Sequence, residues 1–436
     1  MSSIPKYLAN FASLFPEEKN IMSEIRNKDL YPSGQLKIDW VRAHMPLLNG
    51  LEADFSKTKP FKGLKVSLSV HMEAKTAYLC QVLAAGGAEM YATGCNPLST
   101  QDDVAAALDR SGVNVFALHG ATPQEYEHCL RKVLEIGPNI IIDDGGDLVN
   151  LMLTEFRDLI SGVIGGCEET TTGILRLRRL NAAKELPFPM MLVNDAQCKH
   201  YFDNRYGTGQ SVWNGINRAT NLIVAGKTVV VAGYVWCGKG VSMRAKGLGA
   251  KVIVTEIDPV KAIEAVMDGF QVMTMKEAAP KGDLFVTVTG CDDVITAEHF
   301  AIMKDRAILC NAGHFDCEVD VAYLEKSAVK TSPARENIKA YTMEDGKTFY
   351  VIAEGRLVNL AAGDGHPAEI MDMSFAIQAL SAKYLADHRG QEREKGDMLL
   401  NVPEEIDRAV AFRKLAAWGI SIDKLTEKQR LYLYGE

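Results

Sequence analysis

The stretch that decides the fold is Thr228-Val-Val-Val-Ala-Gly-Tyr-Val-Trp-Cys-Gly-Lys-Gly240. Its apolar first half predicts a buried strand, and its glycine-rich second half predicts a tight turn that leads into a helix over residues 241–247. A second strand is predicted over Lys251–Thr255, and Glu256 follows it directly. This order of strand, glycine turn, helix, strand and carboxylate is typical of a dinucleotide-binding unit.

Each residue of this motif has an expected physical role. Gly233 makes the tight turn, and Gly238 lets the new helix pack closely against the strand, while the helix N-terminus offers free N–H groups to a pyrophosphate. Glu256 can accept hydrogen bonds from ribose hydroxyls, which favours NAD because a carboxylate repels a 2′-phosphate. Val235 stands where the motif usually has its middle glycine, so we expect it to push the cofactor outward or to weaken its binding. A glycine-rich turn without a cofactor therefore remains an alternative for this motif alone.

The same alternation of strands and helices occurs on both sides of this stretch. Strands separated by helices of this length predict parallel crossovers and doubly wound sheets. The fold class is therefore α/β, with two doubly wound Rossmann-like domains, followed by a helical segment, a polar stretch and a short C-terminal tail. The remaining predicted strands are 66–70, 89–92, 113–117, 140–142, 285–289 and 307–311; the predicted helices are 104–110, 125–135 and 373–385; and the polar stretch is 388–395.

Composition excludes several classes of protein. The 436 residues are 47% hydrophobic and 24% charged, with a net charge of −8, which is typical of a globular protein and unlike a nucleic-acid-binding surface. No run of about twenty apolar residues predicts a membrane span, and the N-terminus lacks the apolar core of a secretion signal. The nine cysteines are scattered without a C-x-x-C pair, which argues against disulfides and a structural zinc site. We therefore expect a cytoplasmic protein without a metal, a membrane partner or a nucleic-acid partner.

Several long motifs turn this outline into a specific resemblance. From about residue 35 to residue 430 the chain resembles the S-adenosylhomocysteine hydrolase family, which implies an NAD-containing homotetramer. By this resemblance, residues 1–204, completed by about 364–412, form the substrate-binding domain, residues 205–363 form the NAD-binding domain, and residues 413–436 form the tail. The motifs are Asp143-Asp-Gly-Gly-Asp147, Glu168-Glu-Thr-Thr-Thr-Gly173, Val193-Asn-Asp-Ala-Gln-Cys-Lys-His-Tyr-Phe-Asp-Asn204, Val254-Thr-Glu-Ile-Asp-Pro259, Cys310-Asn-Ala-Gly-His-Phe-Asp316, Glu354-Gly-Arg-Leu-Val-Asn359 and Gly365-His-Pro367.

The resemblance implies a reaction in the methyl cycle that splits a nucleoside thioether into a nucleoside and homocysteine. Bound NAD oxidises the ribose 3′-hydroxyl, the resulting ketone acidifies the C4′ hydrogen, homocysteine leaves by β-elimination, water adds, and the ketone is reduced again. By resemblance, Lys199 and Asp203 serve the 3′-hydroxyl, and His71 and Asp144 are the acid–base pair at C4′ and C5′. His314, with Phe315, resembles a gate that admits substrate and then excludes water.

Without the resemblance, a histidine at a strand end is more often structural, and Lys199 with Asp203 is compatible with an exposed helical ion pair.

The other implied site residues bind rather than react. The resemblance assigns the substrate to Glu169, Thr170, Asn194 and His366, and the cofactor to Gly233, Val235, Gly238, Glu256, Asn204, Asn311 and Asn359.

Two departures from the family pattern concern the base of the nucleoside. Glu73 and Lys75 replace the threonine and glutamate that usually follow the histidine–methionine pair. Lys75 can only donate and suits O6 of hypoxanthine, whereas an ionised Glu73 can only accept and suits N1–H. We therefore predict a preference for S-inosylhomocysteine, with guanine not excluded. The alternative is that Glu73 and Lys75 pair with each other and adenine is still accepted. Asp364, where the family has methionine, also points to changed base recognition.

Two further departures concern the cofactor and leave other functions open. The family cysteine near the cofactor appears as Thr208, and we expect the usual C-terminal arm, whose lysine and tyrosine reach a neighbouring subunit's cofactor, to be absent. With Val235, the missing arm predicts weaker or more exchangeable NAD. The competing functions are a non-catalytic nucleotide-sensing relative and an ordinary NAD-dependent dehydrogenase.

Overall fold

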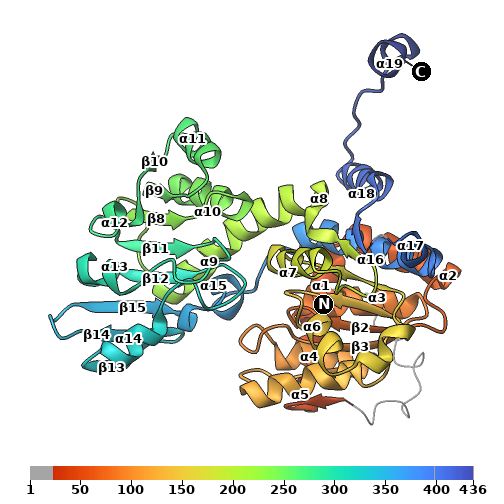
Figure 1. The fold of residues 1–436 in the computed structure, drawn as a ribbon, viewed down its shortest axis with the longest axis horizontal. Coiled ribbons are helices and arrows are strands. Elements are labelled where there is room, and N and C mark those ends of the chain that lie inside the picture. Colours follow the sequence, from red (N-terminus) through yellow and green to blue (C-terminus); the bar gives the residue numbers. More distant parts are fainter. Residues whose placement is uncertain (1–22, 397, 436) are drawn as a thin grey trace, which may run out of the picture.

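The computed structural model describes residues 23–396 and 398–435, which form two lobes lying side by side (Figure 1). Each lobe is built on one eight-stranded sheet. The strands of the first sheet are β1 (Glu24–Ile25), β2 (Lys65–Ser69), β3 (Glu89–Thr93), β4 (Asn114–Ala117), β5 (Ile140–Asp143), β6 (Gly165–Glu168), β7 (Met190–Leu192) and β16 (Leu399–Asn401). Those of the second are β8 (Thr228–Ala232), β9 (Lys251–Thr255), β10 (Gln271–Val272), β11 (Leu284–Thr287), β12 (Ile308–Asn311), β13 (Lys330–Arg335), β14 (Ile338–Thr342) and β15 (Thr348–Ile352).

Helices connect and cover these strands. Those of the first half of the chain are α1 (Tyr31–Ala43), α2 (Pro46–Thr58), α3 (Ala74–Ala85), α4 (Asp102–Arg110), α5 (Pro123–Leu134), α6 (Asp147–Thr154), α7 (Thr171–Ala182), α8 (Gln197–Lys199), the π-helical η5 (His200–Gly207) and α9 (Thr208–Thr220). Those of the second half are α10 (Trp236–Gly247), α11 (Pro259–Met267), α12 (Met275–Ala278), α13 (Ala297–Ile302), α14 (Val321–Ser327), α15 (Val358–Ala361), α16 (Ala368–Asp387), α17 (Gln391–Lys395), α18 (Glu404–Ala417) and α19 (Glu427–Tyr434). The short 3-10 segments are η2 (Lys28–Leu30), η3 (Arg157–Gly162), η4 (Val193–Asp195) and η6 (Ala353–Gly355).

Both sheets share one topology. The order β4-β3-β2-β5-β6-β7 in the first sheet and β10-β9-β8-β11-β12-β15 in the second is the 3-2-1-4-5-6 order of dinucleotide-binding folds. All pairs within these two sets are parallel, and the hairpin β13–β14 adds antiparallel strands at one edge of the second sheet. The predicted fold class, α/β with two doubly wound sheets, is therefore confirmed.

The C-terminal part differs from the expectation of a tail that begins after a polar stretch. Within residues 388–395 the chain forms α17, and β16 then pairs with β7 as an edge strand of the first sheet. Residue 413, where we placed the start of the tail, lies within α18, which packs against α16 and α2. Only the segment after α18 stands clear of the body, and it ends in α19 (Figure 1).

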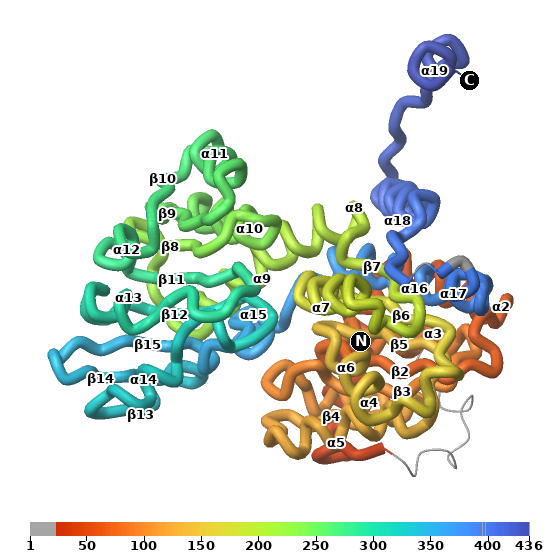
Figure 2. The backbone as a smooth tube through the Cα atoms, in the orientation of Figure 1, coloured from red at the N-terminus to blue at the C-terminus, as the bar shows by residue number. Residues whose placement is uncertain are grey.

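The chain crosses between the lobes twice. Figure 2 shows the first crossing through η5 and α9 and the second between α15 and α16. None of the described helices combines the length and the apolarity that a membrane crossing requires. The two crossings place the carboxyl ends of both sheets toward a shared space between the lobes.

Candidate active site

A cavity of about 560 Å³ lies between the lobes. From the first lobe it is lined by residues that follow strand ends: His71 after β2, Asp144 after β5, and Glu169 after β6. From the second lobe it is lined by segments 235–237, 288–290 and 312–314, which follow β8, β11 and β12. In both sheets the point where the strand order reverses therefore opens into this cavity, which is where open α/β sheets bind their ligands.

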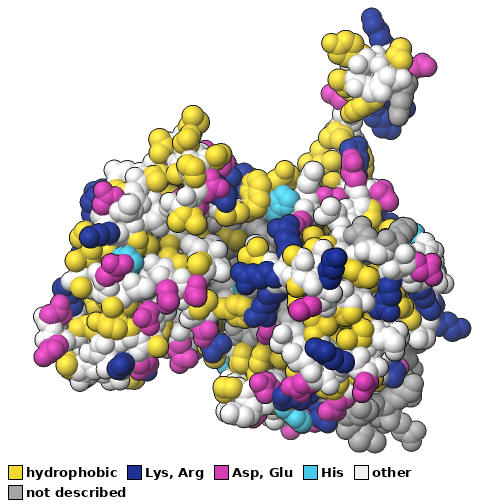
Figure 3. Space-filling view, viewed as in Figure 1, with side chains coloured by type: hydrophobic (Ala, Val, Ile, Leu, Met, Phe, Trp, Pro, Cys, Tyr) yellow, Lys and Arg dark blue, Asp and Glu magenta, His cyan; other side chains and the backbone are white. Residues whose placement is uncertain are grey.

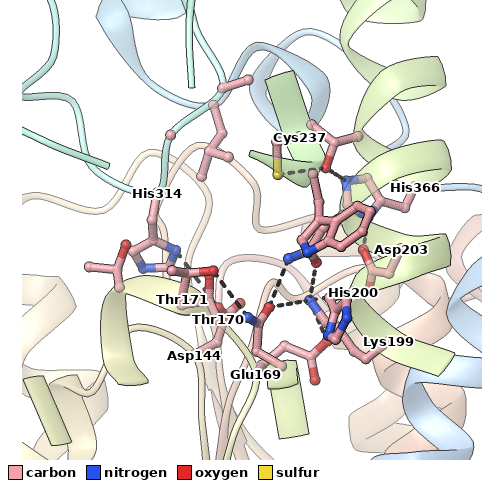
Figure 4. Close-up of a pocket in the computed structure, with 18 of the residues that line it drawn as sticks. Asp144, Glu169, Thr170, Thr171, Lys199, His200, Asp203, Cys237, His314 and His366 are labelled. Carbon is pink, nitrogen blue, oxygen red and sulfur yellow. Dashed lines mark hydrogen bonds and ion pairs between the residues drawn. The ribbon is translucent and has the colours of Figure 1, made fainter. Parts of the chain in front are cut away.

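Asp144 lies between two histidines, one from each lobe. Its carboxylate is 3.6 Å from His71 Nε2 and 3.7 Å from His314 Nδ1, and Figure 4 shows His314 approaching it from the second lobe. Burial lowers the pKa of His71 to about 4, although Asp144 opposes this shift, so that the imidazole is neutral near pH 7. A neutral imidazole beside a carboxylate can accept a proton, which is what acid–base chemistry requires.

Cys95 also contacts Asp144, and sequence reasoning did not identify it as a site residue. Its Sγ lies 3.3 Å from Asp144 Oδ2. Cys95, Asp144 and His71 each offer one possible metal-ligand atom, and these three atoms lie within 4.8 Å of one another. Burial, followed by the charge of Asp144, raises the pKa of the thiol well above its usual range. A metal at these residues would require this thiol to lose its proton.

Lys199 forms the centre of the second cluster. Its Nζ lies 3.4 Å from Asp203 Oδ2 and 3.5 Å from Glu169 Oε1, and only 5% of Lys199 and 2% of Asp203 is exposed. The two are thus a buried pair rather than an exposed helical pair. Nζ also donates to the side-chain oxygens of Asn194 and Asn204 at 3.2 and 2.9 Å.

The charges of this second cluster depend on one another. Burial disfavours the ammonium of Lys199, but Asp203 and Glu169 outweigh it and raise the pKa of the lysine. Burial likewise opposes ionisation of Asp203, yet Lys199 and His366 leave its pKa well below the usual range. For Glu169 burial prevails and raises the pKa to about 8. The resting site therefore holds a charged Lys199–Asp203 pair beside a carboxyl group that keeps its proton more readily.

Two residues of α16 fix the carboxylates that flank Lys199, and the sequence analysis assigned them no role. Ser374 Oγ donates to Asp203 Oδ2 at 2.7 Å, and one turn later Gln378 Nε2 donates to Glu169 Oε2 at 2.6 Å. Their spacing on a predicted helix after the Gly-His-Pro motif was the available signal. The ring of His366 lies 2.6 Å from Asp203 Oδ1 and 3.3 Å from Thr208 Oγ1, at the cavity wall.

Thr170 and Asn194 complete the wall of the first lobe. Both line the cavity, and Asn194 Nδ2 donates to Thr171 Oγ1 at 3.0 Å. Figure 4 shows Thr170 close to Asp144 and Glu169, and residues of both clusters line the same cavity.

Glu73 and Lys75 are buried and paired with each other at the start of α3. The distance from Lys75 Nζ to Glu73 Oε2 is 2.7 Å, and Nζ also donates to the backbone oxygen of Asp364 at 2.9 Å. Glu73 lines the cavity. The direct pairing that we kept as an alternative is therefore present, and it links α3 to the loop that contains Asp364.

The glycine turn of the second lobe fits a dinucleotide. Gly233 has a φ of +100°, and a Cβ at Gly238 would lie 1.9 Å from the Gly233 oxygen, so this turn and helix need both glycines. Glu256 Oε2 accepts from the Tyr234 N–H at 2.7 Å, and Oε1 accepts from the backbone N–H groups of Ile257 and Asp258. Of about four acceptor positions on a carboxylate, one remains on Oε2 for a ribose hydroxyl. Val235 is 45% exposed and lines the cavity at the N-terminus of α10.

The two asparagines expected at the cofactor differ in their surroundings. Asn359 lines the cavity, and its buried Oδ1 has no hydrogen-bond partner among the described residues, which fits an acceptor for a carboxamide N–H. Asn311 is fully buried and is bonded to its own loop: Oδ1 accepts from the Gly313 N–H, and Nδ2 donates to the Phe315 oxygen. Asn311 thus supports the His314–Phe315 loop rather than facing the cavity.

The fold and the site together define a two-lobed α/β enzyme with a dinucleotide-binding lobe and acid–base groups at the interface. Residues 204–365 match the family model described as the NAD-binding domain of S-adenosyl-L-homocysteine hydrolase, and residues 22–160 match the model of S-adenosyl-L-homocysteine hydrolase itself. The chain belongs to the S-adenosyl-L-homocysteine hydrolase family.

Relatives with two different names are about equally similar. The chain is 54% identical to an adenosylhomocysteinase from Thermococcus kodakarensis, over 94% of this chain and 96% of that protein. It is 55% identical to an S-inosyl-L-homocysteine hydrolase from Methanosarcina mazei, over 94% of this chain and 98% of that protein. Among solved structures, a dipicolinate synthase chain from Bacillus halodurans matches 75% of this chain and 99% of its own length at 15% identity, with a TM-score of 0.45. Overall identity to the named relatives therefore does not indicate which base the substrate of this protein contains.

Proposed function

We propose that this protein hydrolyses the thioether of a nucleosyl-L-homocysteine to a nucleoside and L-homocysteine, with NAD retained in the second lobe. One observation carries the proposal: buried Lys199, held by two carboxylates, shares a cavity with the His71–Asp144–His314 group and with the glycine turn. A lysine that can serve a ribose hydroxyl and a separate acid–base group for the ribose carbons, lining one cavity, support this proposal.

Lys199 is the residue that takes the proton of the 3′-hydroxyl. Bound NAD supplies reversible oxidation of that carbon, which makes the neighbouring C4′ hydrogen acidic. Because Asp203 and Glu169 raise the pKa of Lys199, the resting amine carries its proton, and it accepts the 3′-hydroxyl proton only after it has released its own proton to solvent as the ligands bind. Glu169, with Thr170 beside it, binds the ribose hydroxyls, while Asn194 and Asn204 orient the lysine through its amine.

His71 and Asp144 act at the opposite side of the ribose. The neutral imidazole of His71 accepts the C4′ proton, and Asp144 stabilises the resulting imidazolium. The proton is then available to the departing sulfur at C5′. His314 covers Asp144 from the second lobe and keeps bulk water away from the reactive ketone. The intact acid–base groups favour this activity over a non-catalytic sensing role.

The preferred substrate, on this proposal, is the inosyl thioether. Lys75 has three donors, and two of them already point at Glu73 and at the Asp364 oxygen; on this proposal the third donates to O6 of a hypoxanthine. A donor at that position disfavours the amino group of adenine, because a buried donor facing a donor loses its hydrogen bond. Guanine presents the same O6 and N1–H and is the second choice.

We further infer a cytoplasmic homotetramer. All nine cysteines are free, which fits a reducing compartment. Apolar side chains are exposed on α11 and along the segment from α18 to α19, and Figure 3 shows hydrophobic surface on both parts. Exposed apolar surfaces of this kind mark protein–protein contacts.

Thiol detection of homocysteine release tests the proposal. Purified protein with added NAD is given S-adenosyl- and S-inosyl-L-homocysteine in parallel, and we expect release from both with higher kcat/KM for the inosyl compound. Higher kcat/KM for the adenosyl compound would retain the hydrolase and reject the assignment of the base. Release from neither would reject the hydrolase and favour a nucleotide-sensing role, and net consumption of NAD would indicate a dehydrogenase.

A further inference from the structure

The loop of His314 and Phe315 crosses from the second lobe and rests on the first. His314 Nδ1 lies 3.7 Å from Asp144 Oδ1, and a Cβ at Gly145, whose φ is +110°, would lie 2.3 Å from His314 Nε2. The imidazole therefore lies directly against the backbone that follows β5. We call residues 312–316 the gate loop.

Arg176 of α7 joins three segments at this crossing. One of its guanidinium nitrogens, Nη1, donates to the Gly145 oxygen and to Asp147 Oδ1, both at 2.8 Å. Its Cζ lies 4.8 Å from the ring centre of Phe315, within the range of a cation–π contact. A single side chain of the first lobe therefore holds the loop after β5, the start of α6 and the gate loop of the second lobe.

The anchor for this guanidinium is itself fixed. Tyr126 Oη lies 3.0 Å from Asp147 Oδ2 and 3.0 Å from the Cys95 oxygen. Asp147 is thus bound on one side by Arg176 and on the other by a tyrosine that also contacts the Cys95 backbone, beside Asp144. Arg176 cannot follow the gate loop outward without breaking these contacts.

We propose that Arg176 is a positioning residue that latches the gate loop onto the first lobe, so that His314 stays over Asp144 while the ketone exists. The latch rests on the proposed function for its role in turnover, but not for its geometry.

Arg178 offers a matched control on the same helix. It pairs with Asp195 of its own lobe at 2.8 Å, and its side chain is 55% exposed against 39% for Arg176. If Arg176 served only as an ordinary ion pair at the surface, the two arginines would behave alike, because exposed pairs contribute little.

Hydrogen–deuterium exchange of residues 312–316 in the purified full-length protein tests the latch without any substrate. We expect Arg176→Ala to raise exchange in the gate loop at least fivefold and Arg178→Ala to change it less than twofold. Arg176→Lys, which keeps the charge near Phe315 but loses the planar group, is expected to lie between wild type and alanine. Equal exchange in wild type and Arg176→Ala would overturn the proposal.

A double variant separates the contact with Phe315 from a general loss of structure. Phe315→Leu keeps an apolar side chain and removes the aromatic ring. If Arg176 acts through that ring, Arg176→Ala combined with Phe315→Leu exchanges no faster than Phe315→Leu alone. Additive increases would show that Arg176 merely anchors residues 145–147, and would overturn the latch.

Turnover gives an independent readout. A loose gate lets the 3′-keto nucleoside escape before it is reduced; its two electrons remain on the bound cofactor, and that protein molecule becomes inactive. We expect Arg176→Ala to lower the number of turnovers before inactivation about tenfold, with reduced cofactor accumulating, and Arg178→Ala to leave it unchanged. If wild type turns over and Arg176→Ala completes the same number of turnovers before inactivation, the latch is overturned. If wild type releases no homocysteine, the proposed function fails, and the exchange measurement still decides the latch.

Discussion

Lys75 and Glu73 form a buried ion pair with a nitrogen–oxygen distance of 2.7 Å, at the place where α3 meets the loop of Asp364. Each charge of the pair therefore already has a partner within the protein, and Lys75 also donates to the Asp364 backbone oxygen. A base that enters the cavity must therefore form hydrogen bonds with groups that already have partners. The donors and acceptors on the edge of the base decide whether it can form those bonds. The lysine only donates and the ionised glutamate only accepts. Changing the donor and acceptor groups at positions 73 and 75 should therefore change the preferred base.

The first prediction is that Glu73→Thr combined with Lys75→Glu shifts the preference toward the adenosyl thioether. A buried unpaired donor or acceptor costs about 1–3 kcal/mol. The ratio of kcat/KM for the adenosyl thioether to that for the inosyl thioether should therefore rise about tenfold to a hundredfold. The measurement is homocysteine release from both thioethers. Lys132→Glu, at an exposed pair on α5, is the control and should leave the ratio unchanged. An unchanged ratio in the double variant would show that this pair does not read the base.

The second prediction concerns two carboxyl groups that face each other across adjacent strands, Asp143 of β5 and Glu168 of β6. Burial raises the pKa of Asp143 to about 8 and that of Glu168 well above its usual range, and Glu168 Oε2 has no hydrogen-bond partner among the described side chains. In the unfolded chain both groups ionise near pH 4. The folded protein therefore keeps protons that the unfolded chain releases, and the free energy of unfolding falls as the pH rises from about 4 to 8.

Glu168→Gln should flatten this dependence. The glutamine oxygen can still accept from the Gly145 and Thr170 N–H groups, and its amide can donate toward the unpartnered side. We expect the variant to be at least about 1 kcal/mol more stable than wild type at pH 9, and similar at pH 5, in urea unfolding of the full chain. Exposed Glu405→Gln is the control. A variant that is less stable than wild type at both pH values would contradict the neutral carboxyl.

The third prediction follows from the charge of Lys199. Since its pKa is raised by Asp203 and Glu169, homocysteine release should rise with pH until the lysine can lose its proton. Asp203→Asn removes the stronger of these two charges, so the rising limb should move to lower pH by about one unit or more, even though the maximum rate falls. Lys199→Arg cannot give up its proton and should lose at least about a thousandfold in kcat. A rising limb that stays in place in Asp203→Asn would show that another group titrates.

Local parts of the site were accessible to sequence reasoning, and parts assembled from distant segments were not. Lys199 and Asp203 are four residues apart, so helical geometry alone puts them on one face, and the structure places them 3.4 Å apart. The glycine turn and Glu256 are likewise confined to one strand–helix–strand unit. By contrast, Ser374 and Gln378 meet their carboxylates across more than 170 residues, and only the packing of α16 brings them there.

The same distinction holds for the strands. Val-rich β8 and Ile-rich β5 were predicted because apolar β-branched runs are typical of buried parallel strands. Strand β6, Gly-Gly-Cys-Glu, was not, because glycine and glutamate have low β propensity and the strand exists through pairing with β5 and β7. Strand β16 follows a polar stretch and is specified by its pairing with β7, which no local pattern reveals.

The last prediction is that Val235→Gly tightens the binding of NAD. Val235 precedes α10, has ordinary backbone angles, is 45% exposed and lines the cavity, where the pyrophosphate must approach the N-terminus of the helix. Removing the side chain lets the backbone approach more closely, and we expect Kd to fall about tenfold, or 1.4 kcal/mol, in calorimetric titration of protein stripped of cofactor. Val235→Ala removes most of the side chain without adding backbone freedom, and it should reproduce most of the gain if the obstacle is steric. A gain with glycine alone would assign the effect to flexibility of the turn, and no gain with either variant would show that Val235 does not obstruct the cofactor.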